Sequence, residues 1–149
     1  MLFRSAAIAH VLNTVKLDIL QIYGVQDDLP AIRTRFGLPV WRAVGITTAA
    51  DLPIAPQAAD RLLLEAKPPA GATRPGGNAT TFDWSLLQGW SAPTPWILAG
   101  GLTPNNVATA IHETGANAVD VSSGVESSKG VKDTNLIRAF ITAAKTAAP

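Results

Sequence analysis

The chain has 149 residues, enough for one ordinary domain with a hydrophobic core. Hydrophobic residues make up 47% of it, which is typical of a folded globular protein. Twelve basic residues against eleven acidic ones, with no basic run, argue against nucleic acid as a partner. Cysteine is absent, which excludes disulfides and a cysteine nucleophile within these residues and fits a cytoplasmic location.

The N-terminal stretch MLFRSAAIAHVLNTV predicts a helix and not a targeting segment. Arg4 and His10 interrupt its apolar residues, and the remaining ones recur at helical spacing. No apolar run in the chain approaches the roughly 18 residues of a membrane helix. We therefore expect no membrane partner.

Five short apolar runs predict β-strands. They are rich in Leu, Ile and Val, as strands covered on both faces are. Helical patterns lie between them, and this alternation predicts right-handed βαβ units with a parallel sheet, either open or closed into a barrel. The runs are Leu17–Ile22, Val40–Ile46, Arg61–Ala66, Trp96–Gly100 and Asn117–Ser122.

The helical stretches carry recognisable end signals. Glycine just after a helix and Ser, Thr, Asp or Asn just before it are the preferred caps. The expected caps are Gly37 and Gly115 as C-terminal stops, Thr103 as the N-cap of the helix before Gly115, and Asp133 or Thr134 as the N-cap of the last helix.

The loop at residues 66–84, AKPPAGATRPGGNATTFDW, is dense in Gly, Pro and Thr. Loops of this length within a compact domain are usually functional, often as a lid over a site. A tolerated surface insertion is the alternative interpretation.

One predicted strand, RLLLEA, ends on a carboxylate, Glu65, followed by Lys67 and two prolines. In parallel α/β folds, sites gather at the C-terminal ends of the strands. Glu65 is therefore a candidate catalytic acid, and the alternative is an acid that is simply solvated where the strand ends.

The last two strand–loop units, LAGGLTPNN and DVSSGVES, predict a phosphate site. Gly100 and Gly101 let backbone N–H groups come close to a ligand, and Ser122, Ser123 and Gly124 add hydroxyls and amides. Paired phosphate loops after the last two strands are usual in (β/α)₈ barrels.

At this point the sequence resembles a known family. WILAGGLTPNNVATAIHETGANAVDVSSGVESSKGVKD is similar to the C-terminal part of phosphoribosylanthranilate isomerases, and the similarity continues upstream through TFDWSLL, PGGN, LLLEAKPP, VWRAVGI and LDILQIYG. It covers the chain from about Leu17 to its end. The family has a (β/α)₈ TIM-barrel fold.

The resemblance implies an isomerase of tryptophan biosynthesis. Its reaction is the Amadori aldose–ketose rearrangement of N-(5-phosphoribosyl)anthranilate to 1-(2-carboxyphenylamino)-1-deoxyribulose 5-phosphate. This chemistry needs an acid, a base and a phosphate anchor, and no metal or other cofactor. The expected partner is therefore a small phosphorylated sugar.

The resemblance assigns roles residue by residue. Glu65 stands at the position of the general acid, where the family normally has aspartate, and Tyr23 stands where the family has histidine. Lys67 and Arg74 either meet the anthranilate carboxylate or are solvated. The resemblance implies that the phosphate is bound by Gly100, Gly101, Ser122, Ser123 and Gly124. Asp120 is expected to hold either the ligand or the loop amides.

The resemblance begins in the third helix of the family's barrel, and a complete barrel needs about 200 residues. We therefore expect residues 1–149 to form a single partial TIM-barrel domain with five parallel strands, the fourth to eighth of the barrel. The family's base cysteine and a substrate-binding arginine have no counterpart here, so catalysis is expected to be impaired.

The open sheet edges of a partial barrel predict self-association or pairing with a complementing N-terminal fragment. A non-catalytic phosphate-ligand binding or interaction module, derived from the same fold, is the alternative function.

Overall fold

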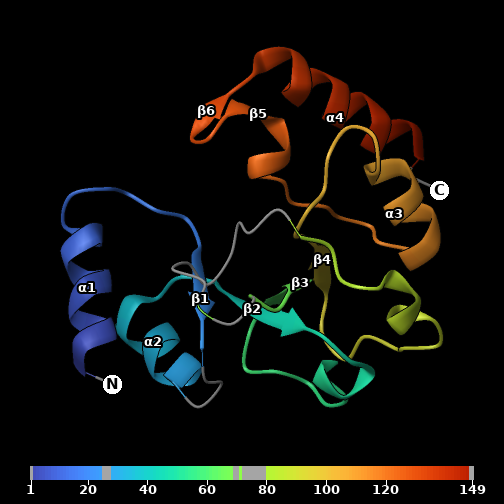
Figure 1. The fold of residues 1–149 in the computed structure, drawn as a ribbon. Coiled ribbons are helices and arrows are strands. Elements are labelled where there is room, and N and C mark those ends of the chain that lie inside the picture. The colour runs from blue at the N-terminus through green and yellow to red at the C-terminus, as the bar shows by residue number, and fades with distance from the viewer. Residues whose placement is uncertain (1, 25–27, 69–70, 72–79, 148–149) are drawn as a thin grey trace.

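The computed structural model describes residues 2–24, 28–68, 71 and 80–147 (Figure 1). Most of the predicted lid, together with Arg74, lies outside them. The helices are α1 (Leu2–Leu12), α2 (Leu29–Phe36), α3 (Val107–Thr114) and α4 (Thr134–Ala147), and the strands are β1 (Leu20–Tyr23), β2 (Val40–Ile46), β3 (Arg61–Ala66), β4 (Trp96–Leu98), β5 (Glu126–Ser128) and β6 (Val131–Lys132). Short 3₁₀ turns cover Ala49–Asp51, Trp84–Leu87 and Ser123–Val125.

A parallel sheet in the order β1-β2-β3-β4 forms the centre of the fold. Four of the five predicted strands are thereby confirmed. The fifth, Asn117–Ser122, is wrong as a strand, because it makes a single parallel bridge between Val119 and Leu98. The Leu98 N–H donates to the Ala118 carbonyl at 3.0 Å, and the Asp120 N–H donates to the Leu98 carbonyl at 2.8 Å.

Three strand boundaries differ from the prediction. β1 ends at Tyr23 and not at Ile22. β1 begins at Leu20, whose N–H donates to the Pro39 carbonyl at 2.9 Å, and not at Leu17. β4 ends at Leu98 and not at Gly100, because Gly100 and Gly101 have φ of 81° and 63°. These left-handed values stop the extended strand and favour glycine.

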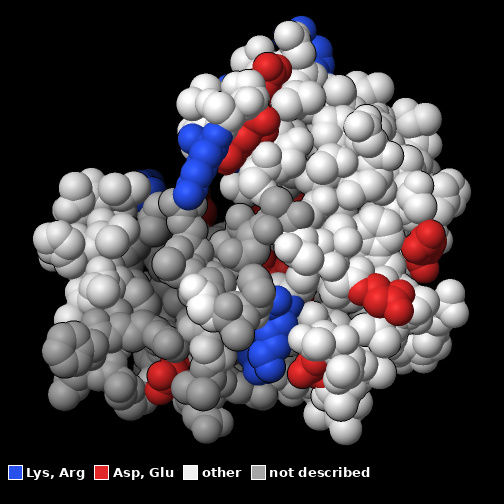
Figure 2. Space-filling view, in the orientation of Figure 1, with Lys and Arg blue, Asp and Glu red and all other residues white. Residues whose placement is uncertain are grey.

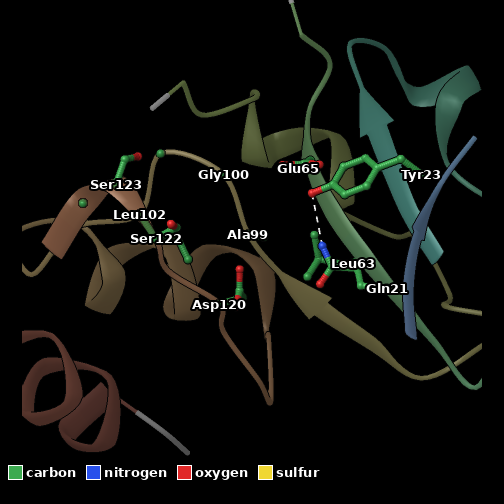
Figure 3. A pocket seen from close by; sticks show the side chains of 12 residues that line it. Gln21, Tyr23, Leu63, Glu65, Ala99, Gly100, Leu102, Asp120, Ser122 and Ser123 are labelled. Atoms are coloured by element: carbon green, nitrogen blue, oxygen red, sulfur yellow. Dashed lines mark hydrogen bonds between the residues drawn. The ribbon is translucent and has the colours of Figure 1, made fainter. Parts of the chain in front are cut away.

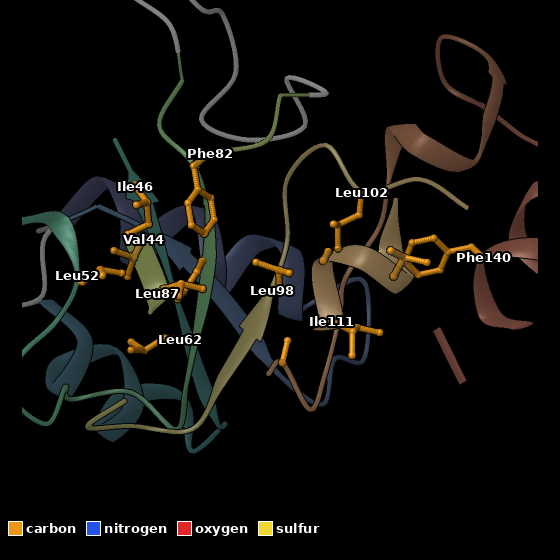
Figure 4. Packing of buried hydrophobic residues seen from close by; sticks show 14 of the residues in the cluster. Val44, Ile46, Leu52, Leu62, Phe82, Leu87, Leu98, Leu102, Ile111 and Phe140 are labelled. Carbon is orange, nitrogen blue, oxygen red and sulfur yellow. The ribbon is translucent and has the colours of Figure 1, made fainter. Parts of the chain in front are cut away.

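Alternating residues of the strands face opposite sides of the sheet. On one side, the apolar core packs the sheet against α3, α4 and the turns before them (Figure 4). On the other side lies a smaller cluster, whose buried members are Ala43, Leu63, Ile97 and Ala99. Glu65 follows Leu63 by two residues and so faces this second side. The large core between the sheet and the helices α3 and α4 stabilises the sheet. The side of the sheet that carries Leu63 and Glu65 has the smaller apolar cluster and therefore has room for polar groups.

The helix ends confirm three caps and correct one. Gly37 and Gly115 have φ of 64° and 66° directly after α2 and α3. The Asp133 carboxylate accepts N–H bonds from Asn135 and Leu136 and caps α4. Thr103 is not an N-cap, because α3 begins at Val107 after a turn.

That turn is held by Asn106. Its side chain accepts from the Thr103 N–H at 2.7 Å and donates to the Gly101 carbonyl at 3.0 Å. The asparagine thus ties the helix start to the glycine loop that follows β4.

Helices α1 and α2 lie beside β1, at the opposite end of the sheet from α3 and α4 (Figure 1). Leu20, Ile22, Leu29, Ile32 and Val40 form most of a separate core there. The predicted N-terminal helix is confirmed as α1. Among the described residues, no helix is both long enough and apolar enough to span a bilayer.

Candidate functional site

A cavity of about 330 Å³ opens at the C-terminal ends of the strands (Figure 3). It brings together eight of the ten residues that the sequence singles out, all except Lys67 and Arg74, which lies outside the described residues, and they come from β1, from β3 and from the segments after β4 and after the bridge. Its lining consists of Gln21, Tyr23, Leu63, Glu65, Ala99, Gly100, Gly101, Leu102, Asp120, Ser122, Ser123 and Gly124.

Glu65 is a buried carboxyl group facing this cavity. It lies at the end of β3, directly beside Gly45 in the sheet register, and the residue is only 6% exposed. Burial raises its pKa above the usual value, and the nearby Asp120 carboxylate raises it further, while a hydrogen bond from Tyr23 opposes the rise. A carboxyl group in this setting holds its proton to higher pH than a solvated one, as a general acid requires.

Tyr23 reaches Glu65 across an intervening strand. It pairs with Ala43 in the sheet register, while Glu65 pairs with Gly45, so β2 lies between the backbones of β1 and β3, which are two strand spacings, about 9.6 Å, apart. The Gln21 amide donates to the Tyr23 hydroxyl at 3.1 Å, which leaves the hydroxyl proton for Glu65.

Tyr23→Phe is expected to raise the pKa of Glu65. The substitution removes a hydrogen bond that stabilises the carboxylate, so the proton is held to higher pH. The measurement is an NMR pH titration of ¹³C-labelled glutamate side chains, with Trp41→Phe on the same sheet face as the control. An unchanged or lowered Glu65 pKa would contradict the arrangement.

Asp120 lies at the rim of the cavity, directly after the bridge that extends the sheet, and its side chain is exposed. Desolvation by the surrounding protein raises the pKa of this carboxyl group, and the positive charge of Lys132 opposes the rise. Asp120 thus lines the same cavity as Glu65 and the predicted phosphate loops.

The glycines after β4 are required by the packing of the chain itself. A Cβ atom on Gly100 would lie 3.1 Å from the Glu65 Cβ and 3.1 Å from the Ala66 nitrogen. A Cβ atom on Gly101 would lie 2.6 Å from the Thr81 nitrogen. The loop therefore presses directly on the end of β3, and this contact fixes the distance from Glu65 to the loop.

The Ser122–Val125 turn packs on the same loop from the other side. A Cβ atom on Gly124 would lie 1.8 Å from the Leu102 carbonyl oxygen, closer than any real contact allows. Glycine at this position is what lets the two loops meet.

Sequence reasoning missed two features of the site. The hairpin of β5 and β6 is antiparallel and follows the second loop directly, where the sequence pattern predicts only loop. Lys132 at its end bonds to Ser122, and the GVKD run after that loop was the available signal.

A second cavity of about 380 Å³ adjoins the first and shares Tyr23 and Glu65 with it. Lys67 lines this second cavity and is exposed. Within the described part of the chain, no group of three or more His, Cys, Asp or Glu side chains could hold a metal ion.

Comparison with known proteins gives one consistent family. A family profile described as N-(5'phosphoribosyl)anthranilate (PRA) isomerase matches residues 4–143. The N-(5'-phosphoribosyl)anthranilate isomerase of Acidiphilium cryptum is 58% identical over 142 residues, which are 95% of this chain and 69% of that protein. The chain thus spans about two thirds of this relative's length.

Solved structures agree with this result. The crystal structure of TrpF from Jonesia denitrificans has a TM-score of 0.74 at 35% identity, over 96% of this chain and 67% of that one. A phosphoribosyl anthranilate isomerase in complex with reduced 1-(o-carboxyphenylamino)-1-deoxyribulose 5-phosphate has a TM-score of 0.74 at 31% identity, over 95% and 66%. The parallel sheet is therefore of the α/β type found in TIM barrels.

Proposed function

Since this chain belongs to the phosphoribosylanthranilate isomerase family, we propose that it acts in the Amadori rearrangement of N-(5-phosphoribosyl)anthranilate. The observation that carries the proposal is the buried Glu65 carboxyl group in the same cavity as two glycine-containing loops. The non-catalytic binding module has no support among the relatives, which are named as isomerases.

Glu65 acts as the general acid in this proposal. Its proton passes to the furanose ring oxygen, the C1–O bond breaks, and the nitrogen lone pair forms a Schiff base at C1. A base then removes the C2 proton to give an enolamine, which becomes the ketose when C1 gains a proton and the C2 hydroxyl loses its own. The raised pKa of Glu65 favours the protonated form that the first step consumes.

The phosphate of the substrate binds between the two loops. Gly100 and Gly101 line the cavity together with Ser122, Ser123 and Gly124, and the two loops meet where Gly124 packs on Leu102. Backbone N–H groups and serine hydroxyls are good phosphate donors. Asp120 orders the second loop or contacts the ribose, and the adjoining cavity with Lys67 accommodates the anthranilate ring and its carboxylate.

The base is the missing part of this assignment, because the sequence contains no cysteine. We propose that residues 1–149 form one partial barrel domain. Further strands pair with the free edge of β1, either from a complementing N-terminal fragment or from a second copy. Two exposed large hydrophobic residues, Val11 and Ile19, line a cavity together with β1 residues. A cytoplasmic location stays a prediction from composition.

Growth of a tryptophan auxotroph that lacks the isomerase tests the function. The chain is expressed alone and together with the first three strand–helix units of a family member. We expect growth with both pieces and weak or absent growth with the chain alone. Failure of both, with the proteins present in the cell, would contradict the proposed function.

A further inference from the structure

Lys132 makes a set of polar contacts at the phosphate end of the cavity that the proposed mechanism does not use. Its ammonium group donates to the Ser122 carbonyl at 2.8 Å, to the Ser122 hydroxyl at 3.0 Å and to the Glu126 carboxylate at 2.7 Å. All three hydrogens of the ammonium group therefore have acceptors. Two of the three bonds end on a residue that lines the cavity.

The β5–β6 hairpin brings the lysine to this place. Glu126 and Lys132 are paired in its register. The Glu126 carboxylate also accepts a hydrogen bond from the N–H of Gly130, which lies in the turn of the hairpin and has a φ of 83°, at 2.9 Å. The Asp133 N–H donates to the Val125 carbonyl at 2.9 Å, directly before α4 begins. The hairpin thus begins directly after the Ser123–Val125 turn, and its other end is bonded back to Val125 in that turn.

The positive charge of Lys132 also acts on a carboxyl group that lines the cavity. Burial raises the pKa of Asp120, which lines the cavity two residues before Ser122, and the positive charge of Lys132 opposes this rise. Figure 2 shows basic and acidic side chains lying together over the region of this hairpin, where Lys132 and Glu126 form their ion pair. The Lys132 side chain is 45% exposed, so solvent screens its charge only in part.

We propose that Lys132 is a positioning residue for phosphate binding. Through its two bonds to Ser122, it holds the Ser122–Val125 turn in the conformation that presents its donors to the phosphate. Within the described residues, Lys132 is also the one lysine whose ammonium group bonds to this turn, so it brings a positive charge to the phosphate site. The inference rests on the proposed phosphate site, but it does not require that the chain catalyse the isomerisation.

The test is calorimetric titration of the chain with inorganic phosphate and with ribose 5-phosphate. Lys132→Met is expected to weaken both by roughly 10- to 100-fold, the usual size of lost hydrogen bonds to a charged group. Lys132→Arg keeps the charge and should bind within about threefold of the unsubstituted chain. Lys129→Met, on the same hairpin, is the matched control and should bind unchanged.

Two further measurements separate positioning from general stability. Raising the salt concentration should weaken binding to the unsubstituted chain more than binding to Lys132→Met. If Lys132→Met does not fold, Lys132→Gln, which keeps a polar donor but loses the charge, takes its place and should weaken phosphate binding in a folded protein. Equal phosphate affinity for the unsubstituted chain and the folded Lys132 variant, or no phosphate binding at all, would overturn the proposal. A failed growth test with lysine-dependent phosphate binding would overturn only the isomerase function.

Discussion

Glu65→Gln is expected to reduce the isomerase turnover of the chain, assayed together with the first three strand–helix units of a family member, by about 10²–10⁴-fold. Glutamine keeps the size of the side chain but has no acidic proton to give to the ring oxygen. Phosphate binding should stay unchanged, because the loops do not depend on the Glu65 charge. The measurement is kcat for N-(5-phosphoribosyl)anthranilate, alongside phosphate titration.

Two variants serve as controls for this result. Glu65→Asp restores the residue that the family normally has and should keep the reaction running. Glu113→Gln, at an exposed position of α3, should leave the rate unchanged. A Glu65→Gln protein with full turnover would show that another group supplies the proton.

The same substitution should change the dependence of stability on pH. The raised pKa means that folded Glu65 holds its proton to higher pH than unfolded Glu65 does. Stability is therefore lost as the pH rises from the ordinary carboxyl range through the raised value, and the loss stays constant above it. Glu65→Gln removes this loss, so the variant should be more stable than the unsubstituted chain at pH 8, and its stability should depend less on pH.

Gly124→Ala is expected to weaken phosphate binding by about 10²-fold, since a displacement near 1 Å at a site has effects of this size. The added methyl would lie 1.8 Å from the Leu102 carbonyl oxygen, so the turn and the glycine loop must separate. Thermal unfolding should show a stability cost of roughly 1–3 kcal/mol from overpacking.

Gly115→Ala is the matched control for Gly124→Ala. Gly115 has a positive φ of 66°, and a Cβ atom added there would meet no other atom within 4 Å, so alanine adds backbone strain without a clash. It should lower stability by about 1–2 kcal/mol and leave phosphate binding unchanged. Equal phosphate affinities for the two alanine variants would contradict the role of the Gly124–Leu102 contact.

Much of the fold can be predicted because the strands are apolar and short. The sequence pattern predicts Val40–Ile46 and Arg61–Ala66 to the residue, since both are bounded by clear polar or proline positions. It does not predict the two ends of β1, which pairing with β2 decides, or the end of β4, which the left-handed Gly100 and Gly101 decide. The residues from Asn117 onward have a strand composition, but β4 leaves them only one bridging partner, Leu98.

The candidate site is predicted from motifs, and the cavity brings those residues together. Their roles stay predictions. The sequence suggests glycines that admit a ligand, and the structure adds a reason within the chain, because Gly100, Gly101 and Gly124 each lie against another backbone segment. The contacts of Lys132 could not be foreseen, because they depend on a hairpin whose strands are three and two residues long.

The proposed phosphate site is tested most directly by calorimetric titration of the chain with reduced 1-(o-carboxyphenylamino)-1-deoxyribulose 5-phosphate, the compound bound by a structural neighbour. We expect one binding site per chain, competition by inorganic phosphate, and weaker binding by Gly124→Ala and Lys132→Met. Absence of binding by a folded chain, or binding that phosphate does not displace, would contradict the proposed site.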